Sequence, residues 1–431
     1  MTAALPKPGS TALVVGLGRS GLAVARFLTG REVRVRACDI RSPEELAGVL
    51  GRLPDGVELR LGGYGTSVLD GCAAVYASPG VPWDAPLLEA ARAAGVAVSS
   101  EIELFFHLCP GEIVGITGTN GKTTTTALTG AVLRRGERPV VVAGNIGEAA
   151  LDRLPEITAR HWVVLELSSF QLESMTSPRV RIGAVLNITP DHLDRHRTLE
   201  RYTDIKARLV EAMEPEDAAV LNSRDPSCRA LAGRTRATVI WFDRHRPVPV
   251  VPMPGRHNLE NAMAAAAVGR RAGVPEDQIQ EAVAAFPGVE HRLELVGEWR
   301  GVRWYNDSKA TNPEAGRVGL AAFEGRPVVL IAGGEGHFDL GAWAADVLRS
   351  ARAVVAVGAD PEPVLRALEG HPRLVRAGSI EEAVEVAAGI AEPGWVVLLS
   401  PAHKSYDQFT DFEERGRRFK AAVRAAQEKR P

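Results

Sequence analysis

The feature that most constrains this chain is the segment at residues 113–123, which reads I-V-G-I-T-G-T-N-G-K-T. A short apolar run typical of a strand leads into a glycine-rich turn, and a segment typical of a helix follows. The backbone N–H groups of such a turn, with the helix N-terminus behind them, bind phosphate oxygens. Lys122 is able to reach the outer phosphates of a nucleotide, and the Thr123 hydroxyl is a ligand for Mg²⁺. Ile116 replaces the first glycine of the generic phosphate-loop pattern, but the segment still predicts ATP or GTP binding.

Length, charge and cysteine usage narrow the class of protein. A chain of 431 residues is too long for one ordinary core, so we expect two to four domains. The net charge of -2 gives no reason to expect a nucleic-acid partner or an acidic membrane surface. Four dispersed cysteines without a C-x-x-C pair argue against a zinc site and a disulfide framework. Because no apolar run approaches 18 residues, we expect a cytoplasmic protein without membrane insertion.

Lysine is rare in this chain, with seven lysines against 44 arginines. Four of the lysines lie away from the termini, at Lys122, Lys206, Lys309 and Lys404. Lysine offers a compact charge or a neutral, modifiable amine, which arginine does not. Each interior lysine is therefore a candidate site residue.

The first hundred residues carry a nucleotide-binding pattern. A strand at 11–15 is followed by G-L-G-R-S-G, by an apolar helix at 22–28 and by a strand at 33–38 that ends at Asp39. An acid 18 residues after the last glycine matches the dinucleotide fingerprint. These residues alone favour NAD, and another nucleotide diphosphate is the alternative.

Two more α/β segments follow. In the second segment, strands are expected at 139–143, 161–165, 183–187, 218–221 and 238–242, and an alanine-rich helix at 261–272. After the break at Phe286-Pro287-Gly288, strands are expected at 302–305, 327–331, 353–357 and 395–399. Ser379, with Glu382 three residues later, predicts a helix start with a capping box.

The predicted fold class is α/β, with three consecutive domains. They are a Rossmann-like N-terminal domain (1–100), a central P-loop ATPase-like domain with a mostly parallel sheet (101–288) and a Rossmann-like C-terminal domain (289–431).

Three residues of the second segment are candidates for metal chemistry. Glu166 ends an apolar strand 43 residues after Thr123, where acids hold Mg²⁺ in nucleotide-hydrolysing folds. A cap on the Ser168-Ser169 turn is the alternative role of Glu166. His192, in N-I-T-P-D-H-L-D-R-H, is a candidate second ligand, and zinc between His192 and His196 is disfavoured because no cysteine or H-E-x-x-H motif supports it. Lys206 can approach a metal only if its positive charge is removed.

These motifs together resemble the Mur ligase family. The resemblance rests on T-G-T-N-G-K-T, E-L-S-S-F-Q-L, N-I-T-P-D-H-L-D-R-H and Y-x-x-x-K, then on G-R-H-N-L-E-N-A, E-H-R and N-D-S-K-A-T-N. It covers essentially the whole chain, in order. The N-terminal G-L-G-x-S-G, Asp39, Ser78-Pro79-Gly80 and the late D-Q-F with Phe412-Glu413 favour the branch that adds glutamate.

The resemblance implies an ATP-dependent amide ligase that joins D-glutamate to UDP-N-acetylmuramoyl-L-alanine through an acyl phosphate, in peptidoglycan precursor synthesis. The first domain then holds UDP rather than NAD. The implied catalytic residues are Lys122, Glu166, His192 and Lys206. We expect a monomer, and the residues themselves leave the chirality of glutamate open.

The resemblance also implies the ligands of each substrate. For ATP these are Gly118, Thr119, Asn120, Gly121, Lys122, Thr123, Thr124, Asn258, Asn261, Arg292 and Asp307. For the UDP-sugar they are Leu17, Gly18, Arg19, Ser20, Asp39, Arg41, Ser78, Asn145 and His192. Two Mg²⁺ ions are implied, one at Thr123 and Glu166, the other at Glu166, His192 and Lys206. Lys206 carries a carbamate formed from CO₂, which supplies the oxygen ligands that Mg²⁺ prefers.

The amino-acid pocket departs from the family pattern. His337 follows Gly333-Gly334-Glu335-Gly336, where the resembling ligase has a lysine. We hypothesise that Lys404, alone or with His337, supplies the missing charge, and that Thr311, Ser405 and the Phe412 backbone complete the pocket. The alternative is that Lys404 is a solvated loop cation.

Two other functions remain open on the sequence. One is a related ATP-dependent ligase, either a sister ligase that adds another amino acid or a folylpolyglutamate-type enzyme. The N-terminal domain with its G-L-G-x-S-G motif disfavours the folylpolyglutamate-type enzyme. A non-catalytic nucleotide switch is disfavoured by Glu166, His192 and Lys206, since a switch needs no second metal site.

Overall fold

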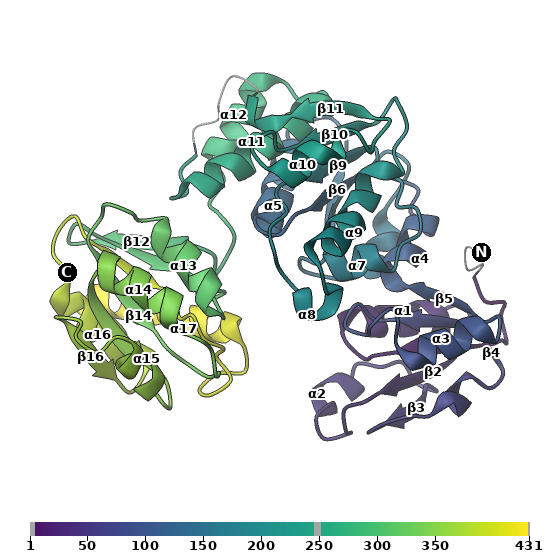
Figure 1. Ribbon diagram of the computed structural model, residues 1–431, viewed down its shortest axis with the longest axis horizontal. Helices are drawn as coiled ribbons and strands as arrows, with labels where there is room; N and C mark the ends of the chain where they lie inside the picture. The colour runs from purple at the N-terminus through teal and green to yellow at the C-terminus, as the bar shows by residue number, and fades with distance from the viewer. Residues whose placement is uncertain (1–4, 245–250, 430–431) are drawn as a thin grey trace. The chain divides into compact units, whose positions relative to one another are not determined.

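The computed structural model describes residues 5–244 and 251–429, which contain three β-sheets with helices packed around each (Figure 1). The chain divides into two compact units. The first unit comprises Met1–Pro249 and Glu260–Val283 and holds two sheets. The second unit comprises Val250–Leu259 and Ala284–Pro431 and holds the third sheet. The predicted α/β class is confirmed.

The first sheet has five parallel strands in the order β3-β2-β1-β4-β5. The strands are β1 (Thr11–Val15), β2 (Arg34–Asp39), β3 (Glu58–Leu61), β4 (Cys72–Ala77) and β5 (Ala97–Ser100). The helices are α1 (Arg19–Thr29), α2 (Ala47–Leu50), η1 (Thr66–Leu69) and α3 (Pro86–Ala93). Ala12 and Val14 of β1 pack into one hydrophobic cluster and Leu13 and Val15 into another, because the central strand is buried on both faces.

The second sheet has six parallel strands in the order β11-β10-β9-β6-β8-β7. Its strands are β6 (Glu112–Thr117), β7 (Val140–Gly144), β8 (Trp162–Glu166), β9 (Ile182–Val185), β10 (Ala218–Leu221) and β11 (Thr238–Trp241). The helices of this region are α4 (Glu101–Leu108), α5 (Lys122–Leu133), α6 (Ala150–Arg153), η2 (Leu154–Glu156), α7 (Ser169–Glu173), α8 (Leu193–His196), α9 (Leu199–Glu211), α10 (Pro226–Leu231), η3 (Phe242–Arg244), α11 (Arg256–Arg271) and α12 (Glu276–Ala284).

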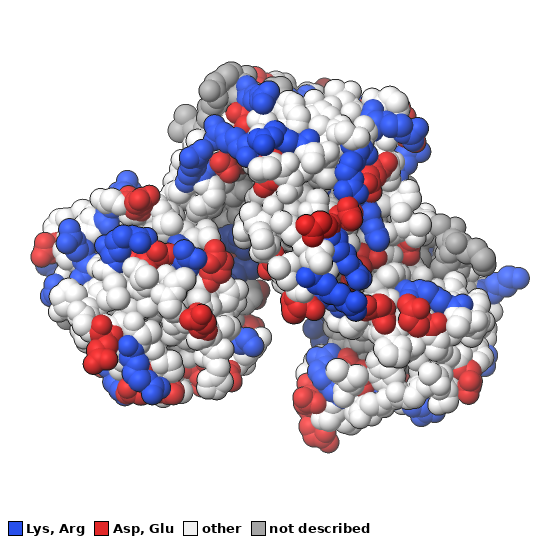
Figure 2. All heavy atoms as spheres, viewed as in Figure 1, with Lys and Arg blue, Asp and Glu red and all other residues white. Residues whose placement is uncertain are grey.

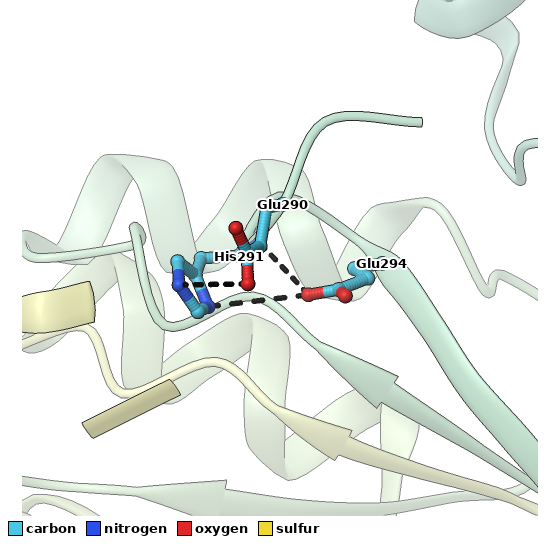
Figure 3. A group of neighbouring side chains, drawn as sticks. All are labelled: Glu290, His291 and Glu294. Carbon is cyan, nitrogen blue, oxygen red and sulfur yellow. Dashed lines mark hydrogen bonds and ion pairs between the residues drawn. The ribbon is translucent and has the colours of Figure 1, made fainter. Parts of the chain in front are cut away.

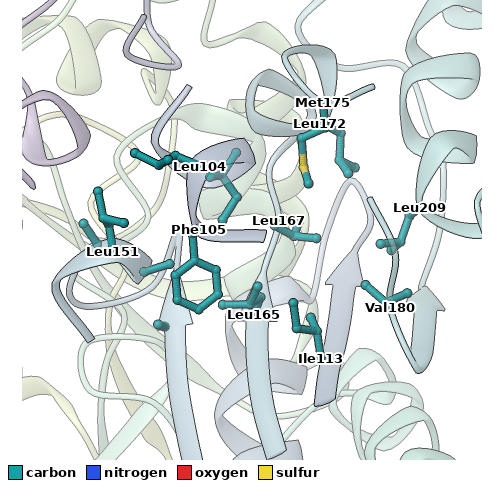
Figure 4. Close-up of a cluster of buried hydrophobic side chains, with 14 of the residues drawn as sticks. Leu104, Phe105, Ile113, Leu151, Leu165, Leu167, Leu172, Met175, Val180 and Leu209 are labelled. Carbon is teal, nitrogen blue, oxygen red and sulfur yellow. The ribbon is translucent and has the colours of Figure 1, made fainter. Parts of the chain in front are cut away.

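The first two sheets share one hydrophobic core. Helix α4 follows β5 directly, and its Leu104 and Phe105 lie in the same cluster as Leu165 and Leu172 (Figure 4). That cluster continues into the first sheet through residues such as Val14. Helix α4 thus joins the two sheets by packing and not only by sequence.

The third sheet is mixed, with the order β12-β13-β17-β14-β15-β16. Its strands are β12 (Glu294–Trp299), β13 (Val302–Asn306), β14 (Val328–Ala332), β15 (Ala351–Val357), β16 (Leu374–Ala377) and β17 (Val396–Leu399). Its helices are α13 (Pro313–Ala321), α14 (Gly341–Ser350), α15 (Glu362–Ala367), α16 (Ile380–Ile390) and α17 (Phe412–Lys429). Only the β12–β13 pair is antiparallel among the described strands.

Some local predictions were wrong at their boundaries. Helix α11 begins at Arg256 and not at residue 261, since its first turn is polar and carries no apolar signal. Strand β12 was missed, because a register shift between Leu295 and Gly297 interrupts its alternation. Ser379 accepts from the Glu382 backbone as expected, but the Glu382 carboxylate accepts from Gly378, so the reciprocal capping box is absent.

The surface carries charges of both signs. Figure 2 shows Lys and Arg interspersed with Asp and Glu on the visible face, and pairs such as Arg138–Glu112 and Arg234–Asp204 are within 2.7 Å. Among the described residues, no helix combines the length and apolarity needed to cross a bilayer.

Candidate active site

The phosphate loop connects β6 to α5, as the sequence predicts. Gly121 has φ +83°, and a Cβ atom there would lie 2.3 Å from Asn261 Oδ1, so any side chain at this position would be strained. Thr125 Oγ1 donates to the same oxygen over 3.2 Å. The structure therefore brings Asn261 of α11 against the loop.

The loop is braced by the segment that follows β9. Asn187 Oδ1 accepts from the Asn120 backbone N–H at 2.8 Å, and Thr119 Oγ1 donates to Thr189 O at 3.1 Å. Lys122 Nζ donates to the carbonyls of Gly118 and Thr119 at 2.9 and 2.7 Å. The ammonium group of Lys122 thus lies at the loop, where phosphate charge would be neutralised.

Glu166 provides a carboxylate at the end of β8. It pairs in register with Ile116 of β6 and is 2% exposed. Its Oε1 accepts from Asn145 Nδ2 at 2.8 Å, and its Oε2 is buried without a hydrogen-bond partner. An unpaired buried carboxylate oxygen fits a hard cation such as Mg²⁺. The alternative role as a helix cap is wrong, because Ser168 caps α7 and forms a capping box with Gln171.

Lys206 of α9 is buried beside the phosphate loop. The residue is 1% exposed, and Nζ donates to Gly118 O at 2.9 Å and to Thr117 Oγ1 at 3.3 Å. Burial lowers the pKa of Lys206 well below its ordinary value, and the neighbouring charge of Lys122 lowers it further. A neutral amine is the form that reacts with CO₂, so this environment fits the implied carbamate.

His192 lies at the start of α8 with a left-handed backbone, φ +51°. Its ring centroid is 4.8 Å from that of Phe170, and Nε2 is 3.5 Å from Asp191 Oδ2. Within the described residues, no hydrogen bond or ion pair joins Glu166, His192 and Lys206 to one another. Their joint role at a metal stays a prediction.

In the first sheet, Asp39 organises the turn after β1. It accepts from Leu17 N at 2.8 Å, and Arg41 donates its backbone N–H, Nε and Nη2 at 2.7 to 3.0 Å. Burial alone would raise the pKa of Asp39, but the bonds from Arg41 and Leu17 hold it at about 2. An NAD-type acid receives ribose hydroxyls. Here N–H groups of Leu17 and Arg41 already donate to the Asp39 carboxylate. The carboxylate is therefore not available to ribose hydroxyls, and NAD binding is disfavoured.

The other predicted UDP-sugar residues surround the same turn. Ser78 Oγ donates to Gly16 O at 2.7 Å. Arg19 extends from α1 to donate to Gly147 O, in the loop that also carries Asn145. Gly18 caps α1, and Ser20 lies in its first turn.

The second unit brings together part of the predicted ATP set. Burial raises the pKa of Asp307 to about 7, although Ser400 Oγ donates to it at 2.9 Å and Arg292 lies nearby. Arg292 Nε is buried without a hydrogen-bond partner. Burial and the Arg292 charge lower the pKa of His257, a neighbour that the sequence analysis did not select. Asn258 Nδ2 donates to Pro254 O at 2.7 Å.

Arg415 of α17 contacts one of the residues predicted for the amino-acid pocket directly and a second through Ser308. It is buried and donates to Ser308 Oγ and O, His403 O and Lys404 O at 2.9 to 3.1 Å. Ser308 Oγ in turn donates to Phe412 O at 2.8 Å. One guanidinium thus ties together the backbone of Ser308, His403 and Lys404.

The predicted pocket residues differ in their exposure. Lys404 and Glu335 exchange both backbone hydrogen bonds, at 2.9 and 3.0 Å, and both residues are exposed. Ser405 is buried, whereas His337 is exposed and makes no hydrogen bond or ion pair in the described part of the chain. Thr311 N donates to Lys309 O at 2.9 Å. Among the described residues, no hydrogen bond or ion pair joins His337 to Lys404 or Ser405.

Comparison with known proteins matches each part of the chain to one family. Three family descriptions apply: "Mur ligase MurD-like, N-terminal domain" at 10–100, "Mur ligase middle domain" at 116–249 and "Mur ligase, glutamate ligase domain" at 291–403. The chain belongs to the Mur ligase family.

Relatives that match nearly the whole chain support its assignment to the Mur ligase family. The chain is 39% identical to the UDP-N-acetylmuramoylalanine--D-glutamate ligase of Acidobacterium capsulatum, over 97% of this chain and 96% of that protein. It is 44% identical to the ligase of the same name from Anaeromyxobacter dehalogenans, over 96% and 97%.

Solved structures support the fold of this Mur ligase. It resembles MurC from Thermotoga maritima with a TM-score of 0.61, at 19% identity over 97% of this chain and 99% of that one. It resembles MurF from Acinetobacter baumannii with a TM-score of 0.60, at 17% identity over 95% and 93%.

One acidic group of the Mur ligase has the donors of a metal site but not the charge balance. Glu290, His291 and Glu294 lie with their ligand atoms within 4.8 Å of one another (Figure 3). Lys420 Nζ, however, contacts Glu290 Oε1 at 2.5 Å and Glu294 Oε1 at 2.9 Å. The Lys420 ammonium already pairs with both carboxylates and occupies the place of a cation, so we assign no metal here.

Proposed function

We propose that this Mur ligase joins D-glutamate to UDP-N-acetylmuramoyl-L-alanine with conversion of ATP to ADP and phosphate. The observation that carries the proposal is identity of about 40% along nearly the whole chain to ligases named for that reaction. The match includes the MurD-like N-terminal domain, which is where the sugar nucleotide would be recognised. We also propose a cytoplasmic monomer with domains at 1–100, 101–288 and 289–431.

The proposed ATP ligands begin with the phosphate loop. Gly118 to Thr124 would hold the phosphates through backbone N–H groups, Lys122 and Thr123. Asn258 and Asn261 would contact the base, and Arg292 and Asp307 would lie near the rest of the nucleotide. The buried, unpaired Arg292 Nε and Glu166 Oε2 support these assignments, because each lacks a partner that a ligand would supply.

Thr123, Glu166, His192 and Lys206 are the proposed residues around two Mg²⁺ ions. When bound, Mg²⁺ would neutralise charge that develops on the transferring phosphoryl group. The carbamate on Lys206 is supported by its burial and lowered pKa, since an uncharged amine is required for its formation.

In the first step, an oxygen of the substrate carboxylate forms a bond to the γ-phosphorus, and the bond from that phosphorus to ADP breaks. Lys122 is placed to neutralise the charge of the leaving phosphates. In the second step, the neutral amine of D-glutamate attacks the acyl carbon, phosphate leaves with the electrons of the C–O bond, and the phosphate takes up the proton that the amine loses. His192 would help to orient the acyl group between the two steps.

The UDP-sugar would bind at the turn organised by Asp39. Leu17, Gly18, Arg19, Ser20 and Arg41 line that turn, and Ser78 and Asn145 lie on the loops beside it. This placement is supported by the direct contact of Arg19 with the loop that carries Asn145.

For the amino acid, Lys404 would pair with a carboxylate of D-glutamate, with Ser405, Thr311 and the Phe412 backbone as further contacts. Exposure of Lys404 next to the buried Ser405 supports this role. His337, at the position of the family lysine, would contribute only if the pocket closes on the amino acid.

Phosphate release tests the function. The protein is incubated with ATP, Mg²⁺ and UDP-N-acetylmuramoyl-L-alanine, and D-glutamate, L-glutamate or other amino acids are added in turn. Release only with D-glutamate supports the proposal. Release with another amino acid keeps the ligase chemistry and overturns the substrate. No release with any acceptor overturns the proposal.

A further inference from the structure

Arg195 joins three segments of the first unit through one guanidinium group. Its Nε and Nη2 donate to Glu173 Oε2 at 3.0 and 2.7 Å, and Nη2 also donates to the backbone carbonyl of Val81 at 2.9 Å. Arg195 belongs to α8, Glu173 ends α7, and Val81 lies in the loop after β4. Glu173 lies in the helix that follows a strand of the second sheet, and Val81 lies in the loop that follows a strand of the first. Arg195 therefore links the regions of the two sheets.

On the side of the first sheet, this contact reaches the predicted sugar-nucleotide turn. Val81 N donates to Ser78 O at 2.9 Å, and Ser78 Oγ donates to Gly16 O at 2.7 Å. A Cβ atom on Gly16 would lie 3.2 Å from Val81 Cγ2, so the loop packs directly on the turn. A shift of Val81 would therefore be transmitted to Ser78 and to the turn itself.

On the other side, Arg195 holds the segment that carries His192. The guanidinium carbon lies 5.2 Å from the Phe170 ring centroid, and the same ring is 4.8 Å from the His192 ring. His196 Nε2 lies 3.0 Å from Ser169 Oγ, so α8 is attached to both ends of α7. Helix α7 begins three residues after Glu166.

Burial distinguishes the Arg195–Glu173 ion pair from the nearby Arg197–Asp84 ion pair. The side chains of Arg195 and Glu173 are 14% and 5% exposed. The nearby pair Arg197–Asp84 joins the same two regions at 3.3 Å, but its side chains are 71% and 50% exposed. A cleft of about 340 Å³, lined by Trp83, Asp84, Glu173 and Arg201 among others, opens beside it. Charged hydrogen bonds are strong when desolvated and weak when solvated, so the buried pair holds this junction.

We propose that Arg195 is a positioning residue that fixes the loop after β4 against the segment carrying His192, so that a UDP-sugar bound at the first sheet presents its carboxylate to the phosphate loop. The inference rests on the proposed function. Geometric misplacement of a bound reactant by about 1 Å costs on the order of 100-fold in rate.

The test compares Arg195→Ala and Arg195→Lys with Arg197→Ala in the full chain. Wild-type phosphate release is measured beside them, so that failure of the proposed function shows separately as an inactive wild type. We expect kcat/KM for the UDP-sugar to fall about tenfold or more in Arg195→Ala, equivalent to ~1.4 kcal/mol. KM for ATP should stay within twofold of wild type, because the hydrogen-bond acceptors of Arg195 in the described part of the chain, Glu173 and Val81, lie outside the phosphate loop. Arg195→Lys should recover part of the loss, and Arg197→Ala should match wild type.

Hydrogen exchange of residues 78–84 gives a readout that does not depend on turnover. We expect faster exchange there in Arg195→Ala than in Arg197→Ala, with the phosphate loop unchanged. Equal exchange in both variants, or equal loss of UDP, ATP and UDP-sugar binding, would overturn the inference. If Arg195→Ala does not fold, Arg195→Lys and Glu173→Gln carry the same comparison, and unchanged kinetics in both would overturn it.

Discussion

The side-chain amide of Asn145 donates a 2.8 Å hydrogen bond to Glu166 Oε1, while Oε2 of the same carboxylate has no partner. Strands β7 and β8 pair in register from Val140 to Gly144, which brings the two residues to the same sheet edge. Asn145 therefore sets which oxygen of Glu166 points away and is available to a cation.

Replacing Asn145 with alanine should weaken the metal site. Loss of a residue that orients a metal ligand typically costs 10–100-fold in affinity or activity. We expect phosphate release to fall by roughly that factor and to need a higher Mg²⁺ concentration for half-maximal rate. A Mg²⁺ titration of Asn145→Ala beside wild type measures this. An unchanged Mg²⁺ requirement would contradict the role given to Asn145.

Replacing Lys206 with methionine should raise thermal stability and abolish activity. Because a buried amine is costly to keep charged, Lys206→Met should remove that cost and raise Tm by a few degrees. The same variant should lose nearly all activity, since the carbamate cannot form. Thermal unfolding and phosphate release, each with and without bicarbonate, check both effects. Activity in Lys206→Met, or no bicarbonate dependence in wild type, would count against the carbamate.

Glu101 predicts a pH dependence of stability. Burial raises the pKa of Glu101 from 4.5 to about 7, although Leu151 N donates to Oε1 at 2.7 Å. Since the folded state binds this proton more tightly than the unfolded state, the stability that Glu101 contributes is fully present below pH 4.5 and is lost as the pH rises to about 7. The change is ~3 kcal/mol at most.

Glu101→Gln isolates that contribution. The amide oxygen of the glutamine can still accept from Leu151 N, and the side chain no longer gains or loses a proton. We expect the difference in Tm between wild type and Glu101→Gln to grow in favour of the variant from pH 5 to pH 8. A constant difference across that range would show that Glu101 is not the responsible group.

Lys404→Ala should weaken binding of D-glutamate specifically. A hydrogen bond to a charged group contributes about 1.5–3 kcal/mol, so KM for D-glutamate should rise on the order of 10- to 100-fold, with KM for ATP unchanged. Lys420→Ala is the matched control, because Lys420 pairs with Glu290 and Glu294. If KM for D-glutamate in Lys404→Ala equals that of the control, Lys404 is a solvated loop cation.

The phosphate loop and the fold class were predictable because their signals are local. A strand, a glycine-rich turn and a helix follow one another directly in the chain, and the need for glycine at position 121 is a property of one backbone angle. Glu166 was selected from a similar local pattern, an acid at the end of an apolar strand, and the structure places it at the end of β8 beside β6. Its role at a metal stays a prediction.

Arg195 and Arg415 were not selected, because their roles depend on contacts between distant parts of the chain. Val81 is 114 residues from Arg195, and Ser308 is 107 from Arg415. In a chain that uses arginine for most of its positive charge, nothing in the sequence separates these two from solvated arginines. The scarcity of lysine was informative by comparison, because it made Lys206 a candidate site residue, and the structure buries Lys206 beside the phosphate loop.

The hydrophobic core shared by the first two sheets limits the exchange of the first domain for a domain from another protein. Helices α1, α4 and α6 pack on one another, and Arg26 adds a 2.7 Å contact to Asp152. A nucleotide-binding domain taken from another protein would arrive without the matching surfaces of α4 and α6, and it would leave apolar side chains in water. Exchange of the first domain for one with a different sugar-nucleotide preference should therefore succeed only when residues 101–108 and 150–153 are exchanged with it.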